Sequence, residues 1–196
     1  MSAVHHESLP PRLRALAIVP AFCWIMNLLY NATITRELGV MMWLCHVTTL
    51  MLAVGLALGL LTPIRMAAVF STIDLPVWLI GVAATHVTSR PSIVSHICVP
   101  VVGWIALAAI RMDRRPLTAH LAGALTYLAI VQVLTRLVTP APLNVNLVYR
   151  PYDFLAAGAS VRMEIYWGVT AALLMSLYIG GVLLFRAIFP PPTGRG

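Results

Sequence analysis

Long apolar runs, separated by short breaks that carry most of the charged residues, are the dominant pattern of this chain. Most of the runs are about 20 residues long, which is the length an α-helix needs to cross the ~30 Å hydrocarbon core of a bilayer. The pattern therefore predicts an all-α, polytopic membrane protein with six transmembrane helices in one bundle. The predicted spans are Ala15–Ala32, Leu38–Leu61, Met66–Thr85, Ser92–Ile110, Leu117–Val138 and Glu164–Phe189.

These spans predict one transmembrane domain at 15–189, between an N-terminal tail at 1–14 and a C-terminal tail at 190–196. The first run continues past Cys23 without a small-residue cleavage site, so we expect a retained helix and not a signal peptide. The one long connection is the predicted outer loop 139–162. A polar loop of this length between two membrane helices is a candidate lid or substrate collar.

The composition excludes a soluble globular protein. Hydrophobic residues make up 60% of the 196 residues and charged residues 10%, and the mean hydropathy is +0.90. A chain of this composition cannot cover its own apolar surface with polar side chains. The formal net charge is +7, but the basic residues are all arginines scattered through the breaks without a basic run, so we predict no nucleic-acid partner.

The arginines indicate an orientation for the bundle. Eight of them fall on the side of the two termini: Arg12, Arg14, Arg65, Arg111, Arg114, Arg115, Arg186 and Arg195. Five fall on the other side: Arg36, Arg90, Arg136, Arg150 and Arg162. The positive-inside rule then places both termini in the cytoplasm, and we expect the protein in a bacterial inner membrane.

Four polar residues, Cys45, His46, Asp74 and His96, lie inside the apolar runs, where polar side chains are costly and usually functional. Counted from the outer ends of the predicted helices at ~1.5 Å per residue, Cys45 lies about 10 Å deep and His96 about 6 Å deep. Asp74 lies deeper, but still in the outer half of the membrane. The sequence therefore predicts a shared, outward-facing pocket beneath the long loop.

The chemistry expected in this pocket is that of a cysteine–histidine pair. A thiol beside an imidazole can lose its proton and become a nucleophile, which makes Cys45 and His96 the predicted catalytic residues. Pro76 and Pro100 remove backbone hydrogen bonds near this depth, and irregular backbone inside a membrane usually lines a cavity. The alternatives are that Cys45 is a small core residue and that His96 makes an interhelical hydrogen bond. Asp74 would orient a histidine, pair with an arginine or be protonated.

Three neighbours of Cys45 on the second predicted helix are further candidates. His46 follows Cys45 directly, so the two side chains point ~100° apart and cannot form a dyad. Thr48 and Thr49 share the face of Cys45. Their hydroxyls would either contribute to the pocket or bond back to the preceding turn of the helix.

Three motifs carry a family resemblance. They are Trp43-Leu44-Cys45-His46 opening one apolar run, Ser95-His96 opening another, and Asn146-Leu147-Val148-Tyr149-Arg150-Pro151 with Asp153 before the last run. Over residues 38–189 their order and spacing resemble those of the YwaF-like integral membrane proteins. That family is similar to eukaryotic transmembrane acyltransferases that act on phospholipids through a membrane-embedded cysteine and histidine. It is more distantly similar to the androgen-induced-gene hydrolases of fatty acid esters of hydroxy fatty acids, which use a threonine and a histidine. The resemblance implies Cys45 as nucleophile and His96 as base, with Thr48 or Thr49 as nucleophile if the threonine variant applies.

The leading functional hypothesis is an acyltransferase or ester hydrolase that acts on a membrane lipid and needs no cofactor. The thiolate of Cys45 would attack the ester carbonyl, and His96 would take the thiol proton and deliver it to the leaving alcohol. The supporting residues would be Asp74, Thr48 and Thr49. The candidate substrate-binding residues are Asn146, Tyr149 and Arg150 in the loop, as oxyanion donors or, for the arginine, as a ligand of a lipid phosphate.

Two other hypotheses stay open. Thiolate, thioether and imidazole ligands together favour Cu(I), and Met42, Cys45, His46 and His96 form a candidate soft-metal set. His46 and His96 alone would be candidate axial ligands of haem iron. The last hypothesis is a small carrier or assembly partner without chemistry of its own.

Overall fold

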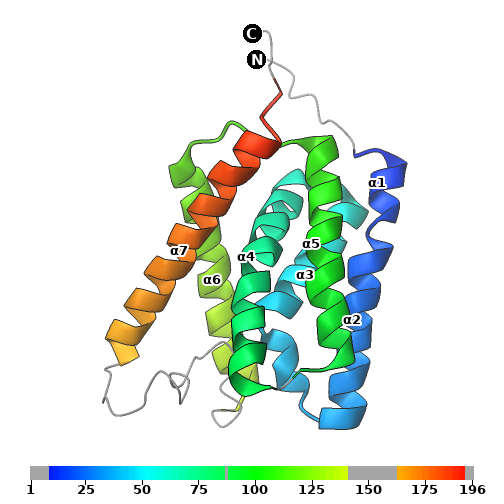
Figure 1. Cartoon of the computed structure of the whole chain (residues 1–196), viewed down its shortest axis with the longest axis vertical. Helices are drawn as coiled ribbons and strands as arrows, with labels where there is room; N and C mark the ends of the chain where they lie inside the picture. The colour runs from blue at the N-terminus through cyan, green and yellow to red at the C-terminus, as the bar shows by residue number, and fades with distance from the viewer. Residues whose placement is uncertain (1–8, 87, 141–162, 193–196) are drawn as a thin grey trace.

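The computed structural model describes residues 9–86, 88–140 and 163–192, and within these residues every regular element is a helix. In chain order the elements are α1 Pro11–Ala15, α2 Ile18–Tyr30, the π-helical turn η1 Asn31–Thr35, the 3₁₀ turn η2 Leu38–Met42, α3 Leu44–Leu58, α4 Leu61–Thr85, α5 Arg90–Ile110, α6 Leu117–Val138 and α7 Met163–Ile188. The helices form one bundle in which α1 and the C-terminal end of α7 lie at the same end (Figure 1). The predicted all-α bundle of six membrane helices is confirmed.

Five helical segments are long and apolar enough to cross a membrane: Pro11–Thr35, Leu61–Ala84, Arg90–Ile110, Leu117–Val138 and Ile165–Ile188. The outward faces of these helices carry large apolar side chains, such as Ile18, which is 71% exposed, and Leu137, which is 75% exposed. In water so much exposed apolar surface would drive association, whereas in a bilayer it contacts lipid tails. The chain is therefore a membrane protein, as its sequence predicts.

The second predicted span is wrong in its bounds. The sequence predicts a continuous helix over Leu38–Leu61, but the backbone breaks at Trp43, whose ψ of 140° is not helical. The carbonyl of Trp43 accepts hydrogen bonds from the amides of His46 and Val47, so Trp43 caps the N-terminus of α3. At its other end α3 stops at Gly59, whose φ of +73° is in the left-handed region that favours glycine. The helix that carries Cys45 therefore has only 15 residues.

Helix α4 lies at the centre of the packing and contacts α3, α5 and α7, while α6 packs against α7. Two glycines allow close approach to α4. A Cβ added to Gly103 of α5 would lie 2.9 Å from the Cβ of Ala68, and one added to Gly181 of α7 would lie 2.9 Å from a methyl of Val69. Small residues at such contacts let membrane helices pack tightly through van der Waals contact. This packing fixes the position of α4, which carries Asp74.

A charged cluster joins the helix ends on the side of the termini. We call Arg65, Asp113, Arg115 and His120 the terminal-side cluster. The carboxylate of Asp113 accepts hydrogen bonds from Arg115 Nε at 2.8 Å and from His120 Nε2 at 2.8 Å, and Arg65 Nη1 lies 3.4 Å away. Burial raises the pKa of the Asp113 carboxyl, but the contacts with Arg115, His120 and Arg65 lower the pKa by a larger amount. The pKa of Asp113 is therefore below its usual value.

Arginines also cap free carbonyl groups at this end of the bundle. Arg65 donates to the carbonyls of Arg111 at 2.8 Å and Ile110 at 3.2 Å, at the C-terminus of α5. The guanidinium of Arg186 in α7 donates to the carbonyl of Arg115. The last carbonyls of a helix have no partner within the helix, so the contacts of Arg65 satisfy them and tie α4 to α5, while the contact of Arg186 ties α7 to the α5–α6 connection.

Candidate functional site

Cys45, Asp74 and His96 come from α3, α4 and α5 and meet at one point. The thiol sulfur, a carboxylate oxygen and a ring nitrogen all lie within 4.8 Å of one another. Within this group, His96 Nε2 lies 3.1 Å from Asp74 Oδ2. The side chain of His96 is 6% exposed and that of Asp74 is 24% exposed. We call these three residues the Cys–Asp–His cluster; the structure brings together three residues that the sequence assigns to one shared pocket.

His96 is held in one orientation by its own helix and by Trp78 of α4. Its Nδ1 lies 2.8 Å from the carbonyl oxygen of Ser92, one turn earlier in α5. Because a carbonyl only accepts, Nδ1 is the donor, which leaves Nε2 to face Asp74. The indole of Trp78 stacks on the imidazole with 4.5 Å between ring centroids and donates from Nε1 to Ser92 Oγ at 3.1 Å. The imidazole is thereby fixed before any substrate binds.

Cys45 is the second residue of α3, so the depth predicted from a helix beginning at Leu38 is wrong. In the first turn of a helix the backbone amides lack intrahelical partners and the helix dipole is positive, which favours a thiolate. Burial in apolar surroundings opposes ionisation of the same thiol. The nearby imidazole of His96 is the group that can tip this balance, because it can accept the thiol proton.

Pro76 and Pro100 both lie close to the cluster, as the sequence predicts, and the helices that contain them continue on both sides. Pro76 is two residues after Asp74 in α4, and Pro100 is one turn after His96 in α5. Neither proline can donate a backbone hydrogen bond to the preceding turn. Pro100 also lines a small cavity of about 10 Å³ together with Cys45, Asp74 and His96.

The three neighbours of Cys45 on α3 make different contacts. Thr49 Oγ1 donates to the carbonyl of Cys45 at 2.8 Å, which is the bond back to the preceding turn. Thr48 Oγ1 instead shares a hydrogen bond of 2.9 Å with the hydroxyl of Tyr127 in α6. His46 is buried and lines the small cavity beside His96. The hydroxyl of Thr48 thus links two helices, and that of Thr49 satisfies backbone.

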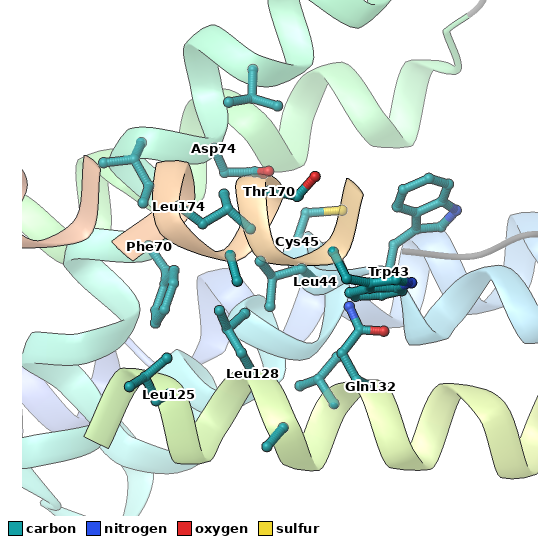
Figure 2. A pocket seen from close by; sticks show the side chains of 16 residues that line it. Trp43, Leu44, Cys45, Phe70, Asp74, Leu125, Leu128, Gln132, Thr170 and Leu174 are labelled. Carbon is teal, nitrogen blue, oxygen red and sulfur yellow. The ribbon is translucent and has the colours of Figure 1, made fainter. Parts of the chain in front are cut away.

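A larger cavity, of about 390 Å³, lies beside Cys45 and Asp74 and is bounded by α3, α4, α6 and α7. We call it the apolar cavity, because most of its lining side chains are aliphatic or aromatic. Its volume falls in the range of ~300–1,000 Å³ typical of small-molecule sites. Figure 2 shows Gln132 toward one end of the cavity, Phe70 and Leu125 at the other, and Cys45 and Thr170 between them. The Cys–Asp–His cluster therefore borders a binding space and not a filled core.

Two polar atoms in the wall of the apolar cavity are buried without a hydrogen-bond partner among the described residues. They are Oε1 of Gln132 in α6 and Nε1 of Trp167 in α7. A buried polar group without a partner costs about 1–3 kcal/mol, so such groups at a cavity wall are ready to bond a ligand. The guanidinium of Arg136 lies 6.0 Å from the centre of the Trp167 ring, which places a positive charge at the same end.

The sequence patterns do not single out four residues of the site: Trp78, Ser92, Gln132 and Trp167. Ser92 could have been found, because it lies one helical turn before His96. Gln132 carried a signal as well, since it is a polar residue within an apolar run. No sequence pattern marks Trp78 or Trp167, because their contacts depend on how α4 and α7 are rotated in the bundle.

The Cys–Asp–His cluster is also the group that can hold a metal ion. Thiolate, carboxylate and imidazole are all zinc ligands, and the bond from His96 Nδ1 to a carbonyl is typical of a metal-binding histidine. This set differs from the predicted one. Asp74 joins Cys45 and His96, whereas His46 is not in the group and Met42 lies in η2, before the break at Trp43.

The predicted substrate-binding residues Asn146, Tyr149 and Arg150 lie outside the described residues. No protein-family model matches the chain, and no curated protein or solved structure is significantly similar to it. The resemblance to the YwaF-like proteins therefore stays a prediction.

Proposed function

We propose that this protein transfers or hydrolyses the acyl group of a membrane lipid ester through Cys45. The observation that carries the proposal is the meeting of a thiol, an imidazole and a carboxylate within 4.8 Å beside the apolar cavity. A buried core cysteine would not border such a space, and a histidine that only linked two helices would not need a stacked indole and a bonded Nδ1.

In the proposed reaction Cys45 Sγ forms a bond to the ester carbonyl carbon, and the bond from that carbon to the alcohol oxygen breaks. The thiol proton passes through His96 Nε2 to the leaving alcohol. Water, for hydrolysis, or a second lipid alcohol, for transfer, then attacks the thioester. The proton of this second nucleophile returns to the thiolate, which regenerates the free enzyme.

Asp74 and Ser92 act on His96 in this scheme. The Ser92 carbonyl fixes hydrogen on Nδ1, so Nε2 and Asp74 Oδ2, which lie 3.1 Å apart, would be two facing acceptors unless the pair holds one proton between them. The base in this scheme is therefore the His96–Asp74 pair as a unit, which takes up the thiol proton in addition to the proton that it already holds. The loop residues Asn146, Tyr149 and Arg150 stay the proposed donors to the oxyanion or to a lipid headgroup.

We place the protein in a bacterial inner membrane with both termini in the cytoplasm. The support is the set of arginines on the side of the termini, of which Arg65, Arg115 and Arg186 meet at one end of the bundle. A C-terminal reporter that is active only in the cytoplasm would test this orientation. Activity of a reporter that folds only outside the cytoplasm would reverse it.

The test of the acyl proposal is site-specific labelling of the detergent-solubilised protein with a long-chain acyl chloromethyl ketone, followed by mass spectrometry. We expect an adduct on Cys45 that falls at least about tenfold in His96→Ala. Cys98→Ala is the matched control, because it removes another partly buried thiol of the same bundle and should leave the Cys45 adduct unchanged. A folded protein with no adduct on Cys45, or an adduct insensitive to His96→Ala, would overturn the proposal.

A second candidate function, a zinc-dependent one, is favoured by the donor set. Thiolate and carboxylate would balance the two positive charges of Zn²⁺, which matters in an apolar interior where net charge is costly. We would titrate the purified protein with Co²⁺ and record the visible absorption of cobalt–thiolate bonds. Stoichiometric binding lost in Asp74→Asn would favour this function; labelling of Cys45 with no cobalt bound would favour acyl chemistry.

A further inference from the structure

The two ends of the apolar cavity differ in polarity, and the helices around it show which end is which. On α6, Gln132 and Leu125 lie seven positions apart, and on α7, Trp167 and Leu174 lie seven positions apart. At ~1.5 Å per residue each pair spans about 10 Å along its helix axis. Polar atoms lie at one end of this distance and aliphatic side chains at the other, as Figure 2 shows for Gln132 and Leu125. The cavity is therefore an elongated slot with a polar mouth and an apolar interior.

The inner end of the slot is closed by aromatic rings. Phe70 of α4 is 1% exposed and packs against Tyr178 of α7 at 4.7 Å and Tyr127 of α6 at 5.2 Å between ring centroids. Tyr127 is fixed in turn by its hydrogen bond to Thr48 of α3. Rings contributed by three helices and anchored to a fourth make a rigid floor. This floor limits how far a ligand can extend toward the middle of the bilayer.

The polar mouth of the slot carries two groups that can form hydrogen bonds with a ligand. Gln132 Oε1 and Trp167 Nε1 are both buried and unpartnered among the described residues, and both belong to the cavity wall. The indole N–H of Trp167 donates and so suits an ester oxygen, whereas Oε1 of Gln132 accepts and so suits a hydroxyl, such as that of a glycerol backbone. Neither group carries a net charge. Cys45 and Asp74 line the same cavity.

We infer that the slot binds one acyl chain of a lipid ester, with the chain end toward Phe70 and the ester linkage at Cys45. This inference rests on the proposed function, because it identifies the chain that the thiol would accept. Gln132 and Trp167 bind the oxygens next to the chain, and the closed floor sets a maximum chain length. The enzyme therefore selects its substrate by the length of the transferred chain.

The first experiment measures activity against chain length with butanoyl, octanoyl and palmitoyl esters of one reporter alcohol. Phe70→Ala removes the floor and should shift the preferred ester toward the longer chain by at least about tenfold in relative kcat/KM. Ala171→Leu puts extra methyl groups into the wall and should reduce activity toward long chains by about tenfold while sparing the butanoyl ester.

The matched control for the wall variant is Ala172→Leu. Ala172 is the next residue of α7, but it is exposed and does not line the slot, so the same change of volume falls on the outer face of the helix. Ala172→Leu should keep the wild-type chain-length profile. Thermal unfolding checks that each variant is folded. Identical chain-length profiles for folded wild type, Ala171→Leu and Phe70→Ala would overturn the inference.

The second experiment separates the slot from the chemistry. Cys45→Ala protein in vesicles is irradiated with a fatty acid that carries a photoreactive diazirine at its chain end, and the crosslinked peptides are mapped. We expect crosslinks in α4 and α6 near the floor, and their loss in Ala171→Leu. If the crosslinks map to the floor but Cys45 of the wild-type protein does not react with the acyl electrophile, the acyl reaction is refuted and the slot is kept. Reactive Cys45 with crosslinks only on the outer helix faces would refute the slot but keep the reaction.

Discussion

The described residues contain two histidine–aspartate pairs, one at each side of the bundle, and their surroundings differ. His120 and Asp113 are 2.8 Å apart on the side of the termini, and His96 and Asp74 are 3.1 Å apart on the other. Asp113 also contacts two arginines. Asp74 has the imidazole and the nearby thiol of Cys45. A distance of about 3 Å therefore does not by itself distinguish a structural pair from a reactive one.

The difference lies in charge compensation and in what the pair faces. The terminal-side cluster has more positive than negative groups around Asp113, and the same arginine that contacts this carboxylate, Arg65, caps the end of α5. Its role is to join helices. The Cys–Asp–His cluster has no arginine contact among its described hydrogen bonds and ion pairs, and it borders the apolar cavity. Its groups therefore border an open space, which the proposed proton exchange with a ligand requires.

Removing the histidine of each pair in turn should give the largest difference between the two pairs, and that difference should be in the reactivity of Cys45. His96→Ala should reduce acyl turnover or Cys45 labelling by about 10²–10⁴-fold, the usual contribution of a general base. His120→Ala is the matched histidine variant and should change reactivity less than about threefold. The measurement is the rate of adduct formation by mass spectrometry. Equal losses in both variants would mean that the two pairs do not differ in function.

The next effect is on stability and runs in the opposite order. Asp113→Ala leaves Arg65, Arg115 and His120 without their shared carboxylate and should lower the free energy of unfolding by about 1–3 kcal/mol, since the part-buried hydrogen bonds to this carboxylate are lost. Asp74→Ala should cost less, because its side chain is 24% exposed and pairs with one histidine. Thermal unfolding in detergent compares the two. A larger loss for Asp74→Ala would reverse the assignment.

The terminal-side cluster should also give the protein a pH dependence. The pKa of Asp113 is below its ordinary value of 3.8, so the folded state gains stability from this carboxylate at pH values above 3.8. That gain should disappear as the pH falls through 3.8 to the lower folded-state pKa. Unfolding temperatures recorded between about pH 6 and about pH 3 should fall more steeply for wild type than for Asp113→Asn. Parallel curves would show that Asp113 is not the group that titrates.

The smallest effect concerns the orientation of His96. Trp78→Phe keeps an aromatic ring over the imidazole but loses the hydrogen bond to Ser92 Oγ. A hydrogen bond of this kind contributes about 0.5–1.5 kcal/mol, so we expect a two- to tenfold loss of Cys45 reactivity. The matched control is Trp104→Phe, which removes the indole donor to Thr72 on the neighbouring face. A loss as large as that of His96→Ala would mean that the ring itself had moved.

The fold class and the membership of the Cys–Asp–His cluster could be predicted from the sequence because both follow from locating apolar runs and the polar residues within them. Cys45, Asp74 and His96 were selected because polar groups in such runs are rare. The break at Trp43 could not be predicted, since its flanking residues continue the apolar run. The rotation of α4 and α5 could not be predicted either, because these helices are apolar around most of their circumference and show no single buried stripe. The partners of His96 and the wall of the apolar cavity depend on that rotation.

The length of α3 bears on how a lipid would reach the thiol. Fifteen residues rise about 22 Å, which is several ångströms short of a ~30 Å hydrocarbon layer. A bilayer adjusts to a short helix by thinning around it, and the glycerol layer then comes closer to the helix end. Cys45 is the second residue at that end. Hydrophobic mismatch would thus lower the carbonyls of surrounding lipids toward the sulfur, and thicker membranes should slow the reaction by withdrawing them.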